Sequence, residues 1–182
     1  MALKSTVFKA TLSISDLDRG YYAEHALTLA RHPSETDERM MIRLLAFTLF
    51  ADPQLEFGKG LSAADEPDLW QRDYTGRITH WIEAGLPDER TVKRALSRAD
   101  KVSVIAYGGR AMEIWWEKEG PALSRLPRLA VLSIDTDSCA MLTALAERSM
   151  QIQCTVQDGA LWLNAGDQML TITPEWRLKP AA

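Results

Sequence analysis

The chain has 182 residues, of which 46% are hydrophobic and 25% charged, so it can bury a core and is not intrinsically disordered. This length suits one domain, and the net charge of −4 excludes a protein coated in basic side chains, although it leaves room for a local basic groove. Two cysteines, Cys139 and Cys154, are too few for a disulfide framework or a four-ligand zinc site, and both are predicted to be reduced, buried thiols.

The N-terminal region is predicted to form two paired strands followed by a helix. Residues 6–15 alternate in polarity over their second half, and Asp16–Gly20 suits a turn. In residues 21–31, Tyr22 and Glu24 alternate with Ala23 and His25, which favours a second strand paired with the first. A helix is expected from about residue 34 to residue 51, where Ser34 and Asp37 give a start that resembles a capping box.

One acidic residue of this predicted helix stands out. Glu38 lies on the apolar stripe, three residues before Met41, where a carboxylate is unexpected. Two interpretations stay open: a first-turn acid that favours the helix dipole, or a residue of a functional site. On another face, Arg39 and Arg43 are placed to pair with Glu35.

A short strand over residues 54–61 leads to a β-hairpin, residues 68–83, around which the chain is organised. Gly76 tolerates positive φ, so Thr75 and Gly76 are predicted to form a two-residue turn. That register places three pairs on one face: Tyr74 with Arg77, Trp70 with Trp81, and Asp68 with Glu83.

Asp68 and Glu83 form the pair with the most chemical interest. Directly opposed side chains lie roughly 4.5–5.5 Å apart at Cβ, so two carboxylates there repel unless a proton or a cation separates them. A hard divalent ion such as Mg²⁺ suits that position. In the alternative interpretation, Asp68 caps a loop and Glu83 is a solvated strand end. Trp70 and Trp81 are candidates for stacking on bases or for packing on each other across the strands.

The remaining pattern alternates helices with apolar strands. A cationic helix is expected over residues 88–100, followed by a strand over 101–107 that is apolar enough to be buried on both faces of a parallel sheet. The other predicted elements are a helix from Arg110, a strand at 129–134, a helix at 137–148, and strands at 150–157, 160–164 and 168–173.

From residue 34 the predicted order is helix, three strands, helix, strand, which is the order of the metal-dependent PD-(D/E)xK nuclease-like fold. In that fold the acids come from the first helix and from the second and third strands, the places that Glu38, Asp68 and Glu83 occupy here. Longer motifs make the resemblance closer. They are Ala30-Arg-His-Pro-Ser-Glu-Thr36, Glu38-Arg-Met-Met41, Asp65-Glu-Pro-Asp68 with Trp70, Trp81-Ile-Glu-Ala-Gly-Leu-Pro-Asp-Glu-Arg90, and Arg110 with Ile114-Trp-Trp116.

Together these motifs resemble the YaeQ family over nearly the whole length of the chain. The resemblance implies a bacterial protein with one α/β domain, residues 1–182, with a core at about 34–107. It also implies a mixed β-sheet flanked by helices, a restriction-endonuclease-like core, and extra N- and C-terminal strands. Because the sequence contains no signal-peptide pattern and no long apolar run, the expected compartment is the cytoplasm, without membrane contact.

The resemblance implies a fold more than an activity, and two hypotheses of function stay open. In the first, Glu38, Asp68 and Glu83 hold Mg²⁺ or Mn²⁺ in a phosphodiesterase that acts on nucleic acid. The lysine expected two residues after the third acid is replaced by Gly85, so Lys93, or Arg90 beside it, is predicted to supply the catalytic cation. In the second, the chain is a non-catalytic module that keeps the nuclease-like fold and docks nucleic acid or a protein.

Overall fold

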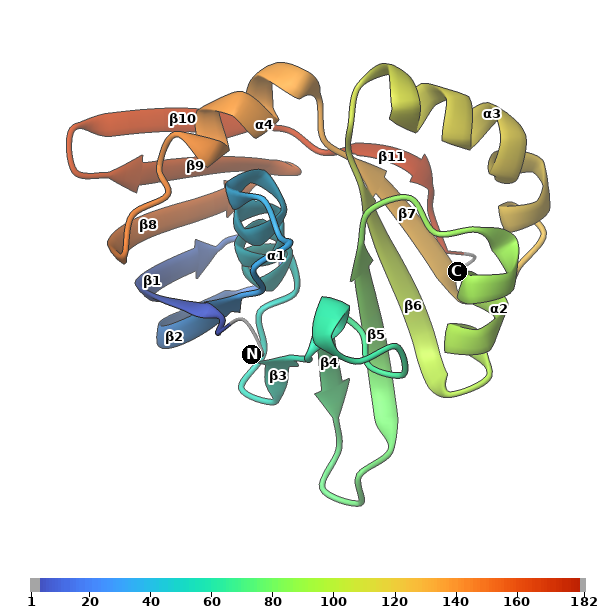
Figure 1. Ribbon diagram of the computed structural model, residues 1–182. Coiled ribbons are helices and arrows are strands. Elements are labelled where there is room, and N and C mark those ends of the chain that lie inside the picture. The colour runs from blue at the N-terminus through green and yellow to red at the C-terminus, as the bar shows by residue number, and fades with distance from the viewer. Residues whose placement is uncertain (1–3, 181–182) are drawn as a thin grey trace. The chain divides into compact units, whose positions relative to one another are not determined.

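The computed structural model describes residues 4–180 and divides them into two compact units (Figure 1). Unit 1 contains the described residues up to Leu44 with Asp137–Pro174, and unit 2 contains Leu45–Thr136 with the described residues from Glu175 onward. In chain order the elements are β1 (Thr6–Asp16), β2 (Tyr21–Arg31), α1 (Asp37–Phe50), β3 (Leu55–Phe57), η1 (Gly60–Ser62), β4 (Leu69–Arg72), β5 (Ile78–Ala84), α2 (Glu89–Leu96), β6 (Ala99–Ala106), α3 (Arg110–Leu123), β7 (Leu129–Ser133), α4 (Thr136–Thr143), β8 (Ser149–Gln157), β9 (Ala160–Ala165), β10 (Gln168–Ile172) and β11 (Glu175–Leu178).

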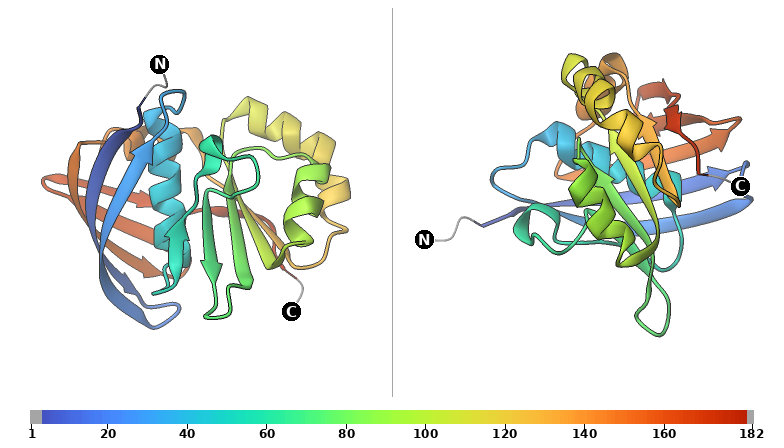
Figure 2. Two further views of the ribbon diagram at one scale, coloured as in Figure 1. Left: turned by 60° about the horizontal axis from the view of Figure 1, so that its bottom comes forward. Right: turned by 90° about the vertical axis from the view of Figure 1, so that its right-hand side faces the viewer.

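Unit 1 is built on a sheet with strand order β10-β9-β8-β1-β2. The predicted N-terminal pair is confirmed, since β1 and β2 are antiparallel from Thr6 opposite Arg31 to Asp16 opposite Tyr21. On its other side β1 runs parallel to β8, so strands that are far apart in the sequence are neighbours in this sheet. β1 and β2 bend along their length, and the first half of α1 lies on the concave side (Figure 2).

The two faces of this sheet differ because side chains alternate along each strand. The inner face carries apolar side chains that form the core of unit 1, including Leu12, Ile152 and Leu163. Both cysteines are buried and outside any disulfide, as predicted. Burial, followed by the nearby Asp16 carboxylate, raises the pKa of the Cys154 thiol to about 12, so this thiol stays protonated.

Helix α1 begins three residues later than predicted. The side-chain hydroxyl of Thr36 accepts a hydrogen bond from the Arg39 N–H at 3.1 Å, so Thr36 caps the helix, whereas Ser34 bonds to His32. The predicted pairing of Arg39 and Arg43 with Glu35 is confirmed, at 2.7 and 2.6 Å.

Unit 2 contains the second sheet, with strand order β11-β7-β6-β5-β4-β3. β3, β4 and β5 are antiparallel neighbours, whereas β5, β6 and β7 are parallel. The predicted order of helix, three strands, helix and strand is confirmed by α1, β3, β4, β5, α2 and β6. The expected fold with one mixed sheet differs from the structure, because the N- and C-terminal strands of unit 1 form a sheet of their own.

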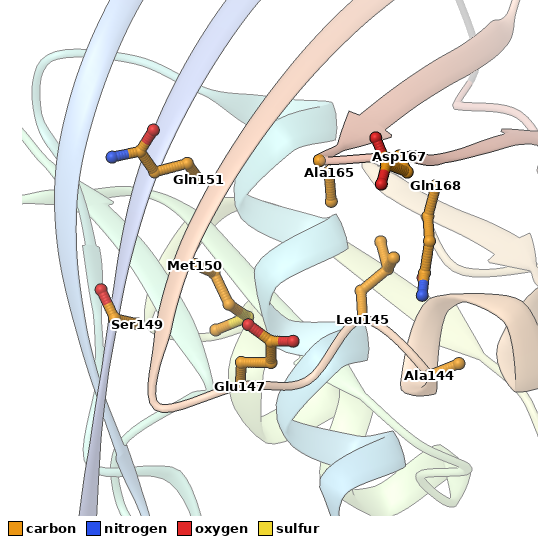
Figure 3. A pocket seen from close by; sticks show the side chains of 10 residues that line it. Ala144, Leu145, Glu147, Ser149, Met150, Gln151, Ala165, Asp167 and Gln168 are labelled. Carbon is orange, nitrogen blue, oxygen red and sulfur yellow. The ribbon is translucent and has the colours of Figure 1, made fainter.

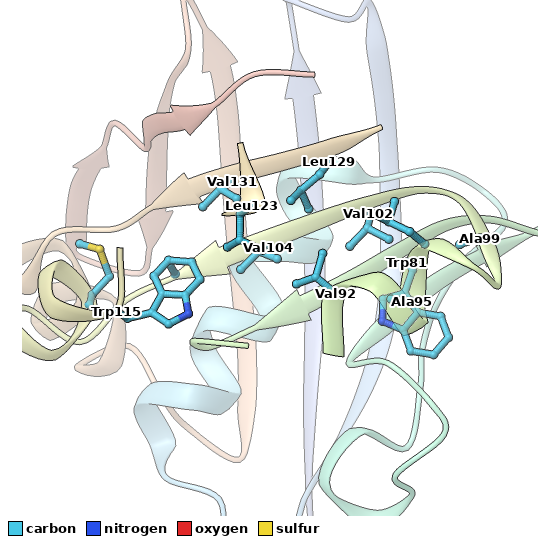
Figure 4. Packing of buried hydrophobic residues seen from close by; sticks show 13 residues of the cluster. Trp81, Val92, Ala95, Ala99, Val102, Val104, Trp115, Leu123, Leu129 and Val131 are labelled. Carbon is cyan, nitrogen blue, oxygen red and sulfur yellow. The ribbon is translucent and has the colours of Figure 1, made fainter. Parts of the chain in front are cut away.

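The core of unit 2 lies between its sheet and helices α2 and α3 (Figure 4). Val92 and Ala95 of α2, together with Trp115 of α3, pack on side chains of β6 and β7 such as Val104 and Val131. Each fully buried side chain of this size contributes roughly 1.5–3 kcal/mol to stability through removal from water. The amphipathic pattern predicted for residues 88–100 therefore describes α2 correctly, although the helix ends at Leu96.

Several boundaries differ from the predictions. β3 covers only three residues, and the helix expected to end at Arg148 ends at Thr143. The predicted helix from Arg110 is α3, which continues through Pro121 to Leu123. β11 was not predicted, and it pairs with β7 in unit 2. Among residues 4–180, no helix has the length and apolar character needed to cross a membrane.

Candidate functional site

The β4/β5 hairpin has the predicted register at its centre. Trp70 lies opposite Trp81, and their rings meet edge to face with centroids 6.3 Å apart. Arg72 lies over the Trp70 ring and Arg98 over the Trp81 ring, at 4.5 and 5.0 Å from the centroids. The cross-strand packing interpretation is therefore confirmed, and Trp81, only 5% exposed, offers no open face for a base.

The turn of the hairpin differs from the predicted two-residue turn. A bulge follows Gln71, and Asp73 rather than Tyr74 faces Arg77, with the Asp73 N–H donating to the Arg77 carbonyl at 2.9 Å. Hydrogen bonds from the Thr75 hydroxyl and from the backbone of the loop lower the pKa of Asp73. The predicted Tyr74–Arg77 pair is wrong because these bonds stabilise a longer loop, in which Tyr74 is 99% exposed.

Asp68 lies directly before β4 and is 1% exposed. Its Oδ2 accepts a hydrogen bond from the Ala84 N–H at 2.8 Å, which ties the start of β4 to the end of β5. Gly60 packs against the same carboxylate, since a Cβ at Gly60 would stand 2.7 Å from Oδ1. The carboxylate therefore holds the preceding loop and the hairpin together.

Glu83 is half-buried near the same end of the hairpin. Its Oε1 accepts a hydrogen bond at 2.8 Å from the indole N–H of Trp81, two residues earlier on the same strand. The ladder of paired residues begins with Leu69 opposite Ile82, so Asp68 and Glu83 are the next residues outward. The structure thus brings these two predicted site residues to one end of the hairpin.

The other predicted site residues lie elsewhere. Glu38 is a half-buried residue in the first turn of α1 and belongs to unit 1, so its assignment as a third metal ligand stays a prediction from the sequence. Lys93 lies on the exposed side of α2 in an ion pair with Glu89 at 2.5 Å, and Arg90 is exposed on the same helix. Gly85 follows the end of β5 with φ +130, a conformation in which a lysine would be strained.

Asp68 and Glu83 each accept one hydrogen bond from the protein, at Oδ2 and Oε1. Their assignment as ligands of Mg²⁺, an ion that is commonly bound by one or two carboxylates together with waters, stays a prediction from the sequence. Within the described part of the chain, no group of three or more His, Cys, Asp or Glu side chains is placed to hold a metal ion.

A buried polar pair in unit 2 was not predicted. His80 and Ser103 lie on neighbouring strands, are 3% and 4% exposed, and share a hydrogen bond of 2.7 Å. A histidine beside a serine can activate a nucleophile, but burial leaves no access for a substrate. The pair therefore stabilises the sheet. In the sequence, Ser103 stands between two valines of an apolar strand, whereas His80 follows Thr79 and has no comparable signal.

The role of Asp68 can be measured by its removal. Asp68→Ala leaves the buried Ala84 N–H without its partner and is expected to lower the free energy of unfolding by about 1–3 kcal/mol. Urea unfolding with and without millimolar Mg²⁺ measures this loss, and Asp65→Ala in the same loop, where the side chain is exposed, is the matched control. If Mg²⁺ stabilises the wild type but not Asp68→Ala, Asp68 is instead a metal ligand.

Comparison with known proteins relates the chain to one family. The family model described as "YaeQ protein" matches residues 1–174. "Uncharacterized protein YaeQ" of Salmonella typhi is 48% identical over 172 residues, which cover 94% of this chain and 95% of the relative. The Escherichia coli (strain K12) protein of the same description is 47% identical over 164 residues, covering 90% and 91%.

Two solved structures resemble the whole chain. The crystal structure of YaeQ protein from Xanthomonas axonopodis pv. citri has a TM-score of 0.93 and 52% identity, with 97% of this chain and 99% of that chain covered. The structure of YaeQ protein from Pseudomonas syringae has a TM-score of 0.89 and 35% identity, covering 94% and 95%.

Proposed function

The chain belongs to the YaeQ family, and from that premise we propose that unit 2 is a non-catalytic nucleic-acid-binding module that keeps the order of elements of a PD-(D/E)xK nuclease. The cationic side of α2 is the observation that carries this proposal. Nucleic acids bind proteins mainly through phosphates, which lysine and arginine neutralise with release of counterions.

Helix α2 separates apolar from cationic side chains. Val92, Ala95 and Leu96 are buried against the sheet, which leaves the opposite side of the helix to solvent. The exposed cations on or directly after this helix are Arg90, Lys93, Arg94 and Arg98. Glu89 offsets one of these charges through its ion pair with Lys93, so the exposed side of the helix stays positive.

The geometry at the end of the hairpin supports binding without catalysis. Asp68 and Glu83 accept hydrogen bonds from the protein, and Lys93 is paired with Glu89. Gly85 replaces the expected lysine at a position where the backbone favours glycine. Asp68, Glu83 and Gly85 therefore serve the fold, and the cationic side of α2 supplies the contact surface.

Salt dependence of binding tests this proposal. Fluorescence anisotropy with a 20-base-pair duplex and a 20-nucleotide single strand is measured between 50 and 200 mM salt. If Arg90 and Arg94 each contact one phosphate, replacing both with alanine should reduce the slope of log K against log salt by about 2, with a uniform loss of affinity across sequences.

Lys118→Ala provides the control, because Lys118 is an exposed cation of α3 in the same unit. This variant is expected to keep the wild-type slope. The proposal fails if neither probe binds at the lowest salt, or if Lys118→Ala changes the slope as much as the α2 variant does.

A metal-dependent phosphodiesterase is the second candidate, favoured by the position of Asp68 and Glu83 at one end of the hairpin. With Glu38, these residues are the proposed ligands of Mg²⁺ or Mn²⁺, and Lys93 is the proposed cation. When bound, the metal would supply Lewis acidity at a phosphate. Cleavage of the same duplex in millimolar Mn²⁺, abolished by Glu83→Gln, would support this candidate over the non-catalytic one.

A further inference from the structure

The outer face of the sheet in unit 1 carries polar side chains in register. On β1, Ser13 lies opposite Glu24 of β2 and beside Gln153 of β8, and Gln153 lies opposite Asn164 of β9. One row therefore crosses four strands and contains a carboxylate, a hydroxyl and two carboxamides. Two residues along β1, Thr11 lies beside Gln151 of β8 and extends the same surface.

A hollow of about 460 Å³ opens on this face. It forms where the sheet narrows, because β9 pairs with β8 only over Gln153–Gln157, whereas β8 continues back to Ser149. Volumes of roughly 300–1,000 Å³ are typical of sites for small ligands. The lining residues are Thr11, Ser13, Glu24, Gln151, Ile152, Gln153, Asn164 and Gly166.

The chemistry of this lining selects its ligand. Hydroxyl and carboxamide groups donate and accept hydrogen bonds, as the hydroxyl groups of a sugar do. The Ser13 hydroxyl donates to Glu24 Oε2 at 3.2 Å, which orients that carboxylate toward the row. Among the described residues that line the hollow there is no lysine or arginine, and Glu24 repels anions, so a phosphate ligand is disfavoured.

Asn164 provides an independent indication of a ligand. Its side-chain Oδ1 is shielded from water and has no hydrogen-bond partner within the described part of the chain. A buried acceptor without a hydrogen bond destabilises the folded protein, because it has lost its contact with water. A ligand hydroxyl that donates to this carboxamide would remove the penalty, which gives Asn164 an energetic reason to turn toward the hollow.

An aromatic ring lies next to the row. Trp162 precedes Asn164 by two residues, projects from the same face of β9, and is 40% exposed. It lies opposite Thr155 of β8, whose neighbour on β1 is Ser15. A flat indole ring beside a set of carboxamides suits a sugar, which has an apolar C–H face and a rim of hydroxyl groups.

A second hollow of about 460 Å³ adjoins the first and shares Gln151 and Gly166 with it. Figure 3 shows Ser149 and Gln151 on one side of β8 and Met150 on the other, facing Leu145. This hollow adds the carboxylates of Glu147 and Asp167 and the carboxamide of Gln168, again without a lysine or arginine among its described lining residues. The surface therefore extends beyond the size of one sugar ring.

We propose that this face of unit 1 is a binding site for a neutral oligosaccharide. The carboxamides of Gln151, Gln153 and Asn164, together with Glu24, bind its hydroxyl groups, and Trp162 packs on one ring. The site is separate from the nucleic-acid surface assigned to α2 and does not depend on it.

Nuclear magnetic resonance of the full-length ¹⁵N-labelled chain tests this site. The probes are maltose, cellobiose and N,N′-diacetylchitobiose, each raised to 10 mM, and inorganic phosphate is the anionic control. A neutral-glycan array screens longer sugars, and every sugar that binds the array is titrated in the same way. Saturable shifts are expected for at least one sugar at backbone amides of β1, β8 and β9 and at the side-chain amide of Asn164.

Single substitutions separate the site from general surface effects. Gln153→Ala and Trp162→Ala are each expected to weaken sugar binding about tenfold, the equivalent of one good contact. Trp176→Ala is the matched control, because Trp176 is a comparably exposed tryptophan of unit 2, at 45%. The proposal is overturned if no sugar binds, if phosphate shifts the same amides, or if Trp162→Ala binds the sugar as the wild type does.

Discussion

Replacing Glu35 with alanine is expected to lower the free energy of unfolding by about 3–5 kcal/mol, a large share of the stability of an ordinary domain. Glu35 is buried and accepts hydrogen bonds from two arginines. Arg43 donates to Glu35 from Nε at 2.9 Å and from Nη2 at 2.6 Å, and Arg39 donates a third hydrogen bond at 2.7 Å.

The effect is large because the substitution removes the carboxylate that both arginines bind and leaves the charge of Arg43 inside the protein. The Arg43 side chain is only 6% exposed, and it also donates a hydrogen bond to the Ala30 carbonyl at 3.2 Å. The guanidinium group cannot be neutralised at ordinary pH, so without Glu35 it must stay charged in a poorly solvated position or move out to solvent. Either change disrupts the start of α1.

Urea unfolding followed by circular dichroism measures this prediction. Asp37→Ala is the control, since Asp37 pairs with Arg31 at an exposed site close by in the sequence and is expected to change stability by about 1 kcal/mol or less. Equal effects of the two substitutions would contradict the assignment of Glu35 as the central acid of a buried ion-pair cluster.

The stability of the protein is expected to fall in mild acid because of His80. Burial of the imidazole, together with the charge of Lys101, lowers the pKa of His80 from 6.5 to about 3. The ring lies between the Ser103 hydroxyl and the edge of Phe50, so the folded protein holds it in the neutral form.

The direction of this pH dependence follows from the number of protons that the folded and unfolded chains bind. Between pH 6.5 and about 3 the unfolded chain protonates His80 while the folded chain does not, so protons favour unfolding in that window. The contribution is fully present above pH 6.5 and decreases by about 1.4 kcal/mol for each pH unit below it. Between pH 7 and pH 5 the expected loss is therefore about 2 kcal/mol from this residue.

The comparison of two histidine substitutions isolates this effect. His80→Gln is expected to show a shallower decrease of unfolding free energy between pH 7 and pH 5, whatever its stability at pH 7. His32→Gln removes a histidine that is not in the core and should keep the wild-type pH dependence. A His80→Gln profile parallel to that of the wild type would show that His80 is protonated in the folded protein.

Local patterns in the sequence predicted the elements whose side chains repeat in a regular way. The second half of β1 and the start of β2 alternate in the sequence, and with the turn predicted between them they indicated the antiparallel pair. The buried side of α2 followed from the spacing of Val92, Ala95 and Leu96. The Trp70–Trp81 pair was predicted from the register of the hairpin. Such a register is well specified because a shift of one residue would move every side chain of the strand to the opposite face of the sheet.

The candidate site was predicted less completely because its chemistry depends on contacts distant in sequence. The spacing of residues in the hairpin predicted that Asp68 lies near Glu83. It did not predict the hydrogen bond from the Ala84 N–H to Asp68, or the close approach of Gly60 to the same carboxylate. Side-chain hydrogen bonds in the Asp73 loop outweighed the turn preference of Gly76. Hydrogen-bond geometry of this kind has no periodic signal in the sequence.

By itself, the sequence determined the regular elements, the order from α1 to β6 and membership of the family. Only the tertiary structure decided that the terminal strands form a separate sheet and that β11 joins β7. It also decided that Ser13 and Glu24 share a row with Gln153 and Asn164, which lie more than a hundred positions away in the chain. Alternation places a side chain on one face of a strand, whereas the neighbours of that strand depend on how the whole chain folds.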